Sequence, residues 1–253
     1  AGQKRDTYSY KTGLGRLDAA IGGIESGELI AIGGPTKNGK TTLAQTITAN
    51  LWEKKVPSVW FTFEVPERQF LQQMPEGVVF YLPKKLSPGD RDWLQDRIIE
   101  AKVKFGTRVV FIDNLHHLID MTTAQNVSQD IGVAIRALKR MAISLNICIF
   151  ILCHSRKPAD TPSGIPKEVS EWDLRDSSFI PQESDSTIMV QRKWNKTARE
   201  FSNQAVIKVC LHRRTGVMGR LIHVVKTGPH LEEDVAFYEG KESDTKQEEE
   251  LPF

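Results

Sequence analysis

The chain of 253 residues is predicted to adopt an α/β fold, with a mostly parallel central sheet flanked by helices and antiparallel strands toward the C-terminus. Up to about residue 153, apolar segments of strand length alternate with segments whose apolar residues recur at helical spacing. This order favours right-handed crossovers and parallel pairing. The expected strands are apolar throughout, which indicates a sheet covered on both faces. After about Asp173 the expected strands follow one another without long helices, which favours antiparallel pairing.

The first half of the chain is expected to contain four strands and two helices. The first helix has Leu43, Ile47 and Leu51 at helical spacing. The second helix follows a capping serine, Ser87, and has Pro88 in its first turn, where proline is well tolerated. The strands are expected at residues 28–33, 58–63, 77–82 and 108–112, and the helices at residues 40–53 and 88–104.

The second half is expected to contain one long amphipathic helix, one apolar strand and three later strands. The helix, at residues 127–145, carries on one face the apolar residues Ile131, Ala134, Ile135, Leu138 and Met141. The segment at residues 156–172 is rich in Pro, Ser, Asp and Lys and is predicted to be a long mobile loop. The strands are expected at residues 147–153, 186–191, 203–211 and 220–225.

Composition places the chain among soluble globular proteins, because 40% of its residues are hydrophobic and 26% are charged. No stretch approaches the roughly 18 apolar residues that a membrane helix needs, so no membrane association is expected. The N-terminus has no apolar signal core. The three cysteines, Cys148, Cys153 and Cys210, form no CxxC pair and are expected to be free thiols. A cytoplasmic location, in a host cell or an organelle matrix for a phage or organelle protein, is therefore expected.

We expect three parts along the chain: a lead-in at residues 1–12, one folded domain at residues 13–240, and an acidic tail at residues 241–253. The tail has two lysines and five acidic residues, a local charge of −3, so that the net charge of +2 leaves the rest of the chain at about +5. A mildly basic body suits a nucleic-acid partner, although excess lysine on a solvated surface explains it equally well.

A phosphate-binding loop is the most specific motif. Residues 34–41 match G-x-x-x-x-G-K-[ST] at every defined position, between an expected strand and an expected helix. The glycines let backbone N–H groups turn toward phosphates, and the positive end of the helix adds attraction. Lys40 is expected to reach the β- and γ-phosphates of ATP, and the Thr41 hydroxyl to hold Mg²⁺. The predicted nucleotide-binding residues are Gly34, Pro35, Thr36, Lys37, Asn38, Gly39, Lys40, Thr41 and Thr42.

Two carboxylates follow expected strands. Asp113 ends the strand at residues 108–112, at the edge of a parallel sheet where ligands bind, and fits a second Mg²⁺-holding group. Glu64 ends the strand at residues 58–63, where a glutamate can orient or deprotonate the attacking water. The alternative for each is a cap on the helix that follows.

Five short motifs, taken together, resemble the DnaB-like replicative helicases. Their order and spacing agree with that family from about residue 12 to residue 225. The motifs are Gly34–Thr42, Phe61–Pro66, Val110–Asn114, Asp173–Ser177 and Gln182–Ser186. The resemblance implies a RecA-like P-loop core and a ring-forming motor, expected to be hexameric. Such a motor uses ATP and Mg²⁺ to translocate on single-stranded DNA and to unwind duplex, usually 5′ to 3′, in DNA replication.

The resemblance also implies catalytic roles within one subunit. Glu64 matches the position of the catalytic glutamate, and Asp113 matches the magnesium-linked carboxylate. His154 follows the strand at residues 147–153, where the family commonly has a glutamine that senses the γ-phosphate. A histidine there is closer to phage primase-helicases and mitochondrial Twinkle. A strand-end histidine with structural contacts alone is the alternative.

A further implied role crosses to the neighbouring subunit. The family carries a basic finger in the turn between two late strands, here residues 212–219. Alignment on Gly216 and Gly219 favours Arg214 as the finger, with Arg213 next. A trans arginine would stabilise the charge that develops during phosphoryl transfer. Ordinary hairpin charges are the alternative.

The resemblance implies that the loops at residues 121–127 and 156–172 face the ring channel and grip DNA through its backbone. Lys157 and Lys167 lie in the second loop, and Trp172 is the only aromatic residue there. About a dozen residues precede the motor, too few for the N-terminal domain and linker helix of the family, which indicates a fragment or a ring that closes differently. The acidic tail ends in Pro-Phe and resembles tails that dock on a replisome partner, although a solvated terminus is the alternative.

Two other functions stay open. One is a RecA- or KaiC-like strand-exchange or regulatory ATPase that depends on DNA. The segments Phe61–Pro66, Asp173–Ser177 and Gln182–Ser186 argue against it. The other is a nucleotide-gated DNA-binding assembly factor that does not unwind DNA.

Overall fold

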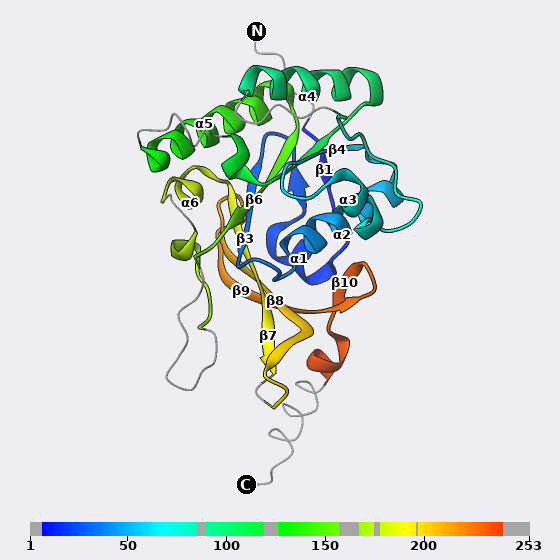
Figure 1. The fold of residues 1–253 in the computed structure, drawn as a ribbon, viewed down its shortest axis with the longest axis vertical. Coiled ribbons are helices and arrows are strands. Elements are labelled where there is room, and N and C mark those ends of the chain that lie inside the picture. Colours follow the sequence, from blue (N-terminus) through cyan, green and yellow to red (C-terminus); the bar gives the residue numbers. More distant parts are fainter. Residues whose placement is uncertain are drawn as a thin grey trace.

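An eight-stranded sheet forms the centre of the structure, a computed structural model that describes residues 7–84, 90–118, 126–156, 167–174, 178–195 and 197–239 (Figure 1). Its strands are β3 (Leu29–Gly34), β4 (Ser58–Thr62), β5 (Val109–Asp113), β6 (Cys148–His154), β7 (Ser186–Asn195), β8 (Glu200–His212), β9 (Val217–Thr227) and β10 (His230–Glu233). The strand order is β10-β9-β8-β7-β3-β6-β5-β4. The pairs from β7 to β4 are parallel, and those from β7 to β10 are antiparallel. The predicted α/β class is confirmed.

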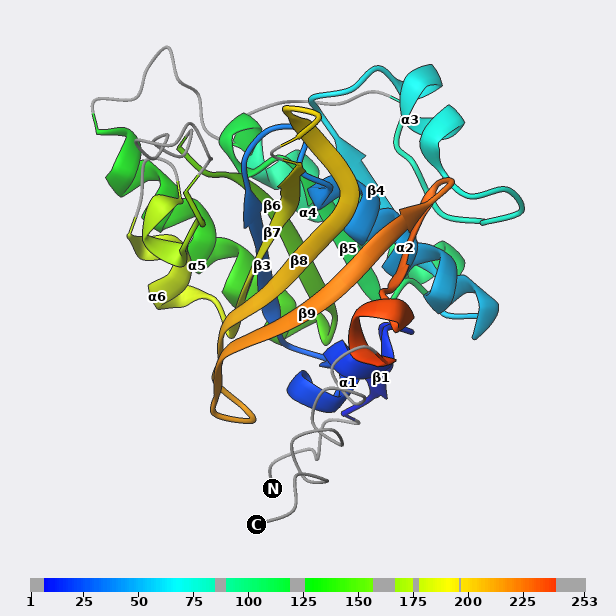
Figure 2. The same cartoon turned by 90° about the horizontal axis from the view of Figure 1, so that it is seen from below.

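Helices cover both faces of this sheet (Figure 2). One face carries α1 (Gly15–Ile21), α2 (Lys40–Glu53) and α3 (Glu67–Gln73). The other carries α4 (Arg91–Phe105), α5 (Val127–Leu145) and α6 (Phe179–Glu183). Two short 3₁₀ helices, η1 (Leu115–Leu118) and η2 (Glu171–Asp173), lie in the connections. Because both faces are covered, the parallel strands are buried along almost their whole length, as their apolar sequences predict.

Three stacked aromatic rings join the parallel strands on the α2 side of the sheet. Phe111 of β5 stacks on Trp60 of β4, with ring centroids 4.7 Å apart, and on Phe150 of β6, at 4.9 Å. The indole of Trp60 donates a hydrogen bond of 3.0 Å to the hydroxyl of Thr48 in α2. This buried stack fixes β4, β5 and β6 relative to α2, the helix that follows the phosphate-binding motif.

The register of the parallel strands brings their C-terminal ends to one edge of the sheet. Gly34 of β3 lies beside His154 of β6, and Asp113 of β5 lies beside Thr62 of β4. Since Glu64 follows β4 by two residues, the strand ends predicted to carry chemistry all converge at this edge.

The last three predicted strands are longer in the structure, and two other predicted elements differ more strongly. The strand expected at residues 77–82 is reduced to one bridge, in which Tyr81 exchanges backbone hydrogen bonds with Trp60 and Ser58 at the β4 edge. The helix expected from residue 88 begins at Arg91, and the side chain of Asp90 caps it by accepting a hydrogen bond from the Trp93 amide. The proposed cap Ser87 and Pro88 lie outside the described residues.

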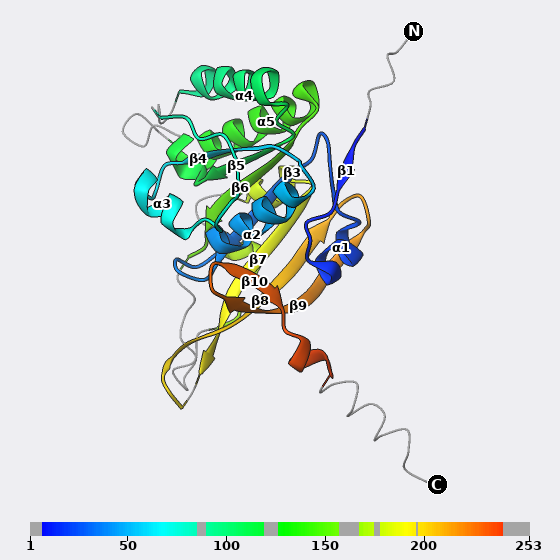
Figure 3. The same ribbon diagram turned by 90° about the vertical axis from the view of Figure 1, so that its right-hand side faces the viewer.

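The start of the described chain packs beside β9 (Figure 3). Strands β1 (Ser9–Tyr10) and β2 (Ile24–Glu25) form a small antiparallel pair around α1. Asp18 of α1 accepts hydrogen bonds from the backbone and hydroxyl of Thr12 and from the Gly13 amide. Part of the predicted lead-in is therefore tied to the domain. Among the described residues, no helix has the length and apolar character needed to cross a membrane.

Candidate nucleotide-binding and catalytic site

The phosphate-binding motif forms the connection between β3 and α2, as its sequence context predicts. Gly34 has a φ of 149°, and a Cβ atom there would lie 2.3 Å from the carbonyl oxygen of Val190, so only glycine fits. Gly39 has a φ of 96° and occupies the N-cap of α2, where no side chain caps the helix. The first amides of α2 therefore lack a side-chain acceptor of their own, which suits anionic phosphate oxygens.

Lys40 lies across this loop. Its buried ammonium group donates hydrogen bonds of 3.0 Å to the carbonyl oxygens of Gly34 and Pro35. Burial lowers the pKa of Lys40, and the charges of Asp113 and Glu64 oppose that shift. An anionic partner such as a triphosphate would stabilise the charged form of this buried ammonium group more strongly than neutral carbonyl groups do.

Thr41 and Asp113 are brought together, as a magnesium site requires. The Thr41 hydroxyl donates a hydrogen bond of 2.8 Å to the Asp113 carboxylate, whose residue is only 2% exposed. Burial raises the pKa of Asp113 to about 6, against the opposing effects of this hydrogen bond and of the Lys40 charge. Burial makes the carboxylate costly to ionise, and a divalent cation bound beside it would favour its ionised form. A hydroxyl and a carboxylate side by side therefore suit a divalent cation.

Glu64, Asn114 and His154 form a triangle at the neighbouring strand ends. The Nδ2 group of Asn114 donates a hydrogen bond of 2.9 Å to Oε2 of Glu64. Nε2 of His154 lies 3.0 Å from the same oxygen and 3.0 Å from Nδ2 of Asn114. With a proton on Nε2, as in the charged imidazolium, His154 donates to Glu64; as the other neutral tautomer it accepts from Asn114.

Burial raises the pKa of Glu64, but the hydrogen bond from Asn114 and the charge of His154 outweigh it and hold that pKa below its usual value. Glu64 is therefore ionised at neutral pH and can accept a proton or a hydrogen bond from water. The alternative of a helix cap does not fit the structure, since Pro66 is the N-cap of α3 and no side chain caps that helix.

Of the other residues in the phosphate-binding motif, one is buried and hydrogen-bonded, and the others are exposed or half-buried. Asn38 is buried, and its side chain accepts a hydrogen bond of 2.9 Å from the Arg192 amide and donates one of 3.0 Å to the Thr36 carbonyl. Thr36 and Lys37 are exposed at the tip of the loop, and Thr42 is half-buried in the first turn of α2. The motif is thus tied to β7 through Asn38 and is open at its tip.

Asn114 is the site residue that sequence reasoning did not single out. Asn114 lies in the motif Val110–Asn114, directly after Asp113, and this position is what could have identified it from the sequence. Its role depends on Glu64 and His154, which lie 50 positions before it and 40 after it in the sequence.

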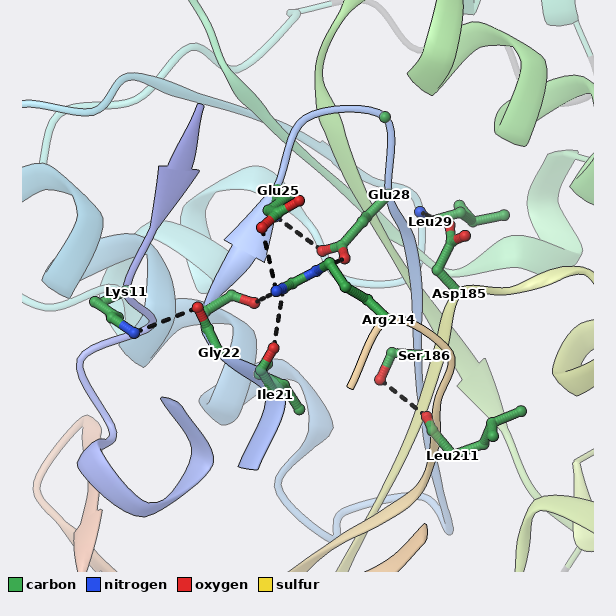
Figure 4. A network of polar contacts seen from close by, with 12 residues as sticks. Lys11, Ile21, Gly22, Glu25, Glu28, Leu29, Asp185, Ser186, Leu211 and Arg214 are labelled. Atoms are coloured by element: carbon green, nitrogen blue, oxygen red, sulfur yellow. Dashed lines mark hydrogen bonds and ion pairs between the residues drawn. The ribbon is translucent and has the colours of Figure 1, made fainter. Parts of the chain in front are cut away.

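Arg214 contacts four residues of its own chain (Figure 4). Its guanidinium contacts Glu28 at 2.9 Å and Glu25 at 3.1 Å, and donates to the carbonyl oxygens of Ile21 and Gly23 at 2.9 and 2.7 Å. Arg213 similarly donates to the Ser184 carbonyl at 2.9 Å and to that of Gln182. In the single chain both candidate fingers therefore hold the β8–β9 turn against its own subunit.

Asp185, in the motif at residues 182–186, has a structural position. Its carboxylate accepts hydrogen bonds from the Leu29 amide at 2.7 Å and from Lys139 at 2.6 Å, and so joins β3 to α5. The motif at residues 173–177 is described only at its start, because residues 175–177 lie outside the described residues.

The candidate DNA loops are described only in part. Residues 121–125 and 157–166, with Lys157, lie outside the described residues. Lys167 is exposed, and its carbonyl oxygen accepts a hydrogen bond of 3.0 Å from Gln191. Trp172 is 70% exposed on the same connection, so the aromatic ring of this loop is available to a partner.

Comparison with known proteins agrees with this geometry. The chain is 25% identical over 228 residues to the replicative DNA helicase DnaB of Treponema pallidum (strain Nichols), covering 78% of this chain and 51% of that protein. This chain therefore spans about half the length of that curated relative. A solved ATPase domain superimposes with a TM-score of 0.73 at 16% identity, covering 88% of this chain and 90% of its own.

A second solved structure, of a DnaB-like replicative helicase studied with its primase interactions, superimposes with a TM-score of 0.70 at 16% identity. It covers 87% of this chain and 62% of its own. At these identities the two structures establish the fold. The family profile of the DnaB-like helicase C-terminal domain matches residues 9–77 and 91–226, which is most of the chain. The chain belongs to the DnaB-like helicase C-terminal domain family.

Proposed function

We propose that this chain is the ATP-hydrolysing motor of a replicative DNA helicase, which translocates on single-stranded DNA and unwinds duplex. The observation that carries the proposal is the convergence, at one sheet edge, of the β3–α2 loop, the Thr41–Asp113 pair and the Glu64–His154 pair. Family membership supports the reaction class. The direction 5′ to 3′ is proposed on the family resemblance.

ATP is the proposed substrate, held by the loop at residues 34–42. The amides at the start of α2 and the ammonium group of Lys40 would bind its phosphates. Thr41 and Asp113 would hold Mg²⁺, which when bound neutralises charge on the phosphates. Lys40 would exchange its two loop carbonyl partners for phosphate oxygens, which removes the cost of its burial.

Glu64 is the proposed general base. Oε2 of its ionised carboxylate accepts a hydrogen bond from Asn114 and lies 3.0 Å from Nε2 of His154, so that the carboxylate is held at the open edge of the sheet. A carboxylate in this place orients the attacking water and accepts its proton. His154, at the end of the strand next to β3, is proposed to contact the γ-phosphate.

Single-stranded DNA is the proposed nucleic-acid partner. The chain outside the tail is mildly basic, and Lys167 and Trp172 are exposed on the connection that follows β6. A cation and an aromatic ring suit phosphate contact and base stacking without sequence readout. A motor that advances along any sequence needs contacts of this kind.

A homo-oligomeric ring, hexameric by resemblance, is proposed to complete the site. Arg214, or Arg213 beside it, would contact the nucleotide of the neighbouring subunit. Because Arg214 has four contacts within its own chain, this role requires it to exchange Glu25 and Glu28 for the phosphates. The acidic tail at residues 241–253, outside the described residues, is proposed on its composition to dock on a replisome partner.

The test is a comparison of ATP hydrolysis with and without single-stranded DNA, made on particles of measured mass and followed by an unwinding assay on a forked duplex. The proposal predicts DNA-stimulated hydrolysis and strand separation in a six-membered particle. Hydrolysis without unwinding would favour the regulatory ATPase. DNA binding that depends on nucleotide, with negligible hydrolysis, would favour the assembly factor.

A further inference from the structure

Asn114 contacts both polar side chains of the proposed hydrolytic centre. It directly follows β5 and is 3% exposed, so its carboxamide is withdrawn from solvent. Its Nδ2 group lies 2.9 Å from Oε2 of Glu64 and 3.0 Å from Nε2 of His154. Asn114 thus contacts side chains at the ends of both β4 and β6, which lie on either side of β5.

The orientation of this carboxamide is fixed from its other side. Oδ1 accepts a hydrogen bond of 3.1 Å from the His116 amide and lies 3.0 Å from Nδ1 of His117. A backbone amide can only donate, so the oxygen must face η1 and the NH₂ group must face Glu64 and His154. The backbone of η1 therefore determines that the NH₂ group of Asn114, and not its oxygen, faces Glu64.

We propose that Asn114 is a positioning residue for ATP hydrolysis, whose Nδ2 donor holds the Glu64 carboxylate beside His154. This proposal rests on the proposed ATPase function. The Glu64 side chain is 38% exposed and belongs to the chain that follows β4. A general base must be held close to its working geometry, and a misplacement of about 1 Å can cost on the order of a hundredfold in rate.

A purely structural role makes a different demand on the same side chain. As a cap for η1, Asn114 needs only the Oδ1 acceptor for the His116 amide. An aspartate provides that acceptor equally well, but it replaces the Nδ2 donor with a second acceptor that repels Glu64. The substitution Asn114→Asp therefore separates the two roles.

The experiment measures kcat and KM for ATP in wild-type protein, Asn114→Asp and Asn114→Ala. We expect kcat to fall about tenfold or more in both variants, with KM within about twofold of wild type. Asn195→Asp is the matched control, because Oδ1 of Asn195 accepts hydrogen bonds from the amides of Thr197 and Ala198, and an aspartate keeps that acceptor. Its kcat is expected to equal that of wild type.

A second comparison tests whether Asn114 acts through Glu64. In a Glu64→Gln background, Asn114→Ala is expected to reduce kcat no further, because the group that it positions has lost its function. Wild-type kcat in Asn114→Asp, a rise in kcat, a loss confined to KM, or an unfolded Asn114→Asp protein would each overturn the positioning role. Absence of ATP hydrolysis in the wild-type protein would instead overturn the proposed function itself.

Discussion

At the scale of single residues, the site combines groups whose burial is unfavourable until a ligand arrives. Lys40 is 6% exposed, and within the described part of the chain its ammonium group donates hydrogen bonds to loop carbonyl oxygens. Asp113 is 2% exposed, with a pKa raised to about 6 by burial. Each has the charge sign that complements one part of a magnesium–triphosphate complex. Such displaced pKa values in a pair of opposite charges are typical of functional sites.

Replacing Lys40 with alanine is predicted to abolish ATP hydrolysis, because the cation that contacts the phosphates is lost. The measurement is the steady-state rate of phosphate release at saturating ATP. Lys54→Ala is the control: this lysine lies just beyond the C-terminus of the same helix and is exposed. Near-wild-type turnover in Lys40→Ala would show that the loop at residues 34–42 is not the hydrolytic site.

At the scale of elements, the order of the long strands and long helices was predictable, but the short elements α1, α6 and β10 were not predicted. The helices at residues 40–53 and 127–145 were predicted with their observed bounds, because regular apolar spacing reports burial directly. The segment at residues 77–82 has the apolar residues of a strand, but it lies at the sheet edge and forms one bridge to Val59. The pattern of apolar residues in a segment does not indicate how many of its residues will pair with a neighbouring strand.

The same reasoning explains which parts of the site were predictable. Short contiguous motifs can be recognised from the sequence alone, and such motifs contain Lys40, Thr41 and Asp113. The bridging role of Asn114 is set by strand order, which places β5 between β4 and β6. The contacts of Arg214 with Glu25 and Glu28 join positions nearly 190 residues apart, and no sequence pattern indicates them.

The aromatic stack is predicted to contribute strongly to stability. Phe111→Ala should lower the free energy of unfolding by about 3–5 kcal/mol, because it leaves a cavity between Trp60 and Phe150. Phe105→Ala, at a position 50% exposed at the end of α4, should cost about 1 kcal/mol or less. Urea titrations that give equal losses for the two variants would contradict the buried stack.

At the scale of the whole molecule, the structure describes one subunit of a proposed ring. The β8–β9 turn is held to the β2 region by Arg214 (Figure 4). Arg213 holds it to the α6–β7 connection. The orientation of this turn therefore depends on the subunit itself. A neighbour's nucleotide would have to compete with two carboxylates for the Arg214 guanidinium.

Mixing wild-type and Arg214→Ala subunits is predicted to reduce ATP hydrolysis more than in proportion to the mutant fraction, because each mutant subunit disables a neighbour's site. Glu28→Gln is the control, since it breaks the ion pair within the chain and leaves the guanidinium in place. If Glu28→Gln reproduced the loss, or if the loss in mixtures were strictly proportional, the contribution of Arg214 would be confined to its own subunit.

The most direct test of the account is the effect of Glu64→Gln on ATP binding and on turnover, measured side by side. We predict that the variant binds ATP with nearly wild-type affinity, because the loop at residues 34–42 and the Thr41–Asp113 pair are unchanged. Its kcat is predicted to fall by about a hundredfold or more, since a general base is lost. A parallel loss of binding and turnover, or turnover at the wild-type rate, would contradict the assignment of these strand ends as one hydrolytic site.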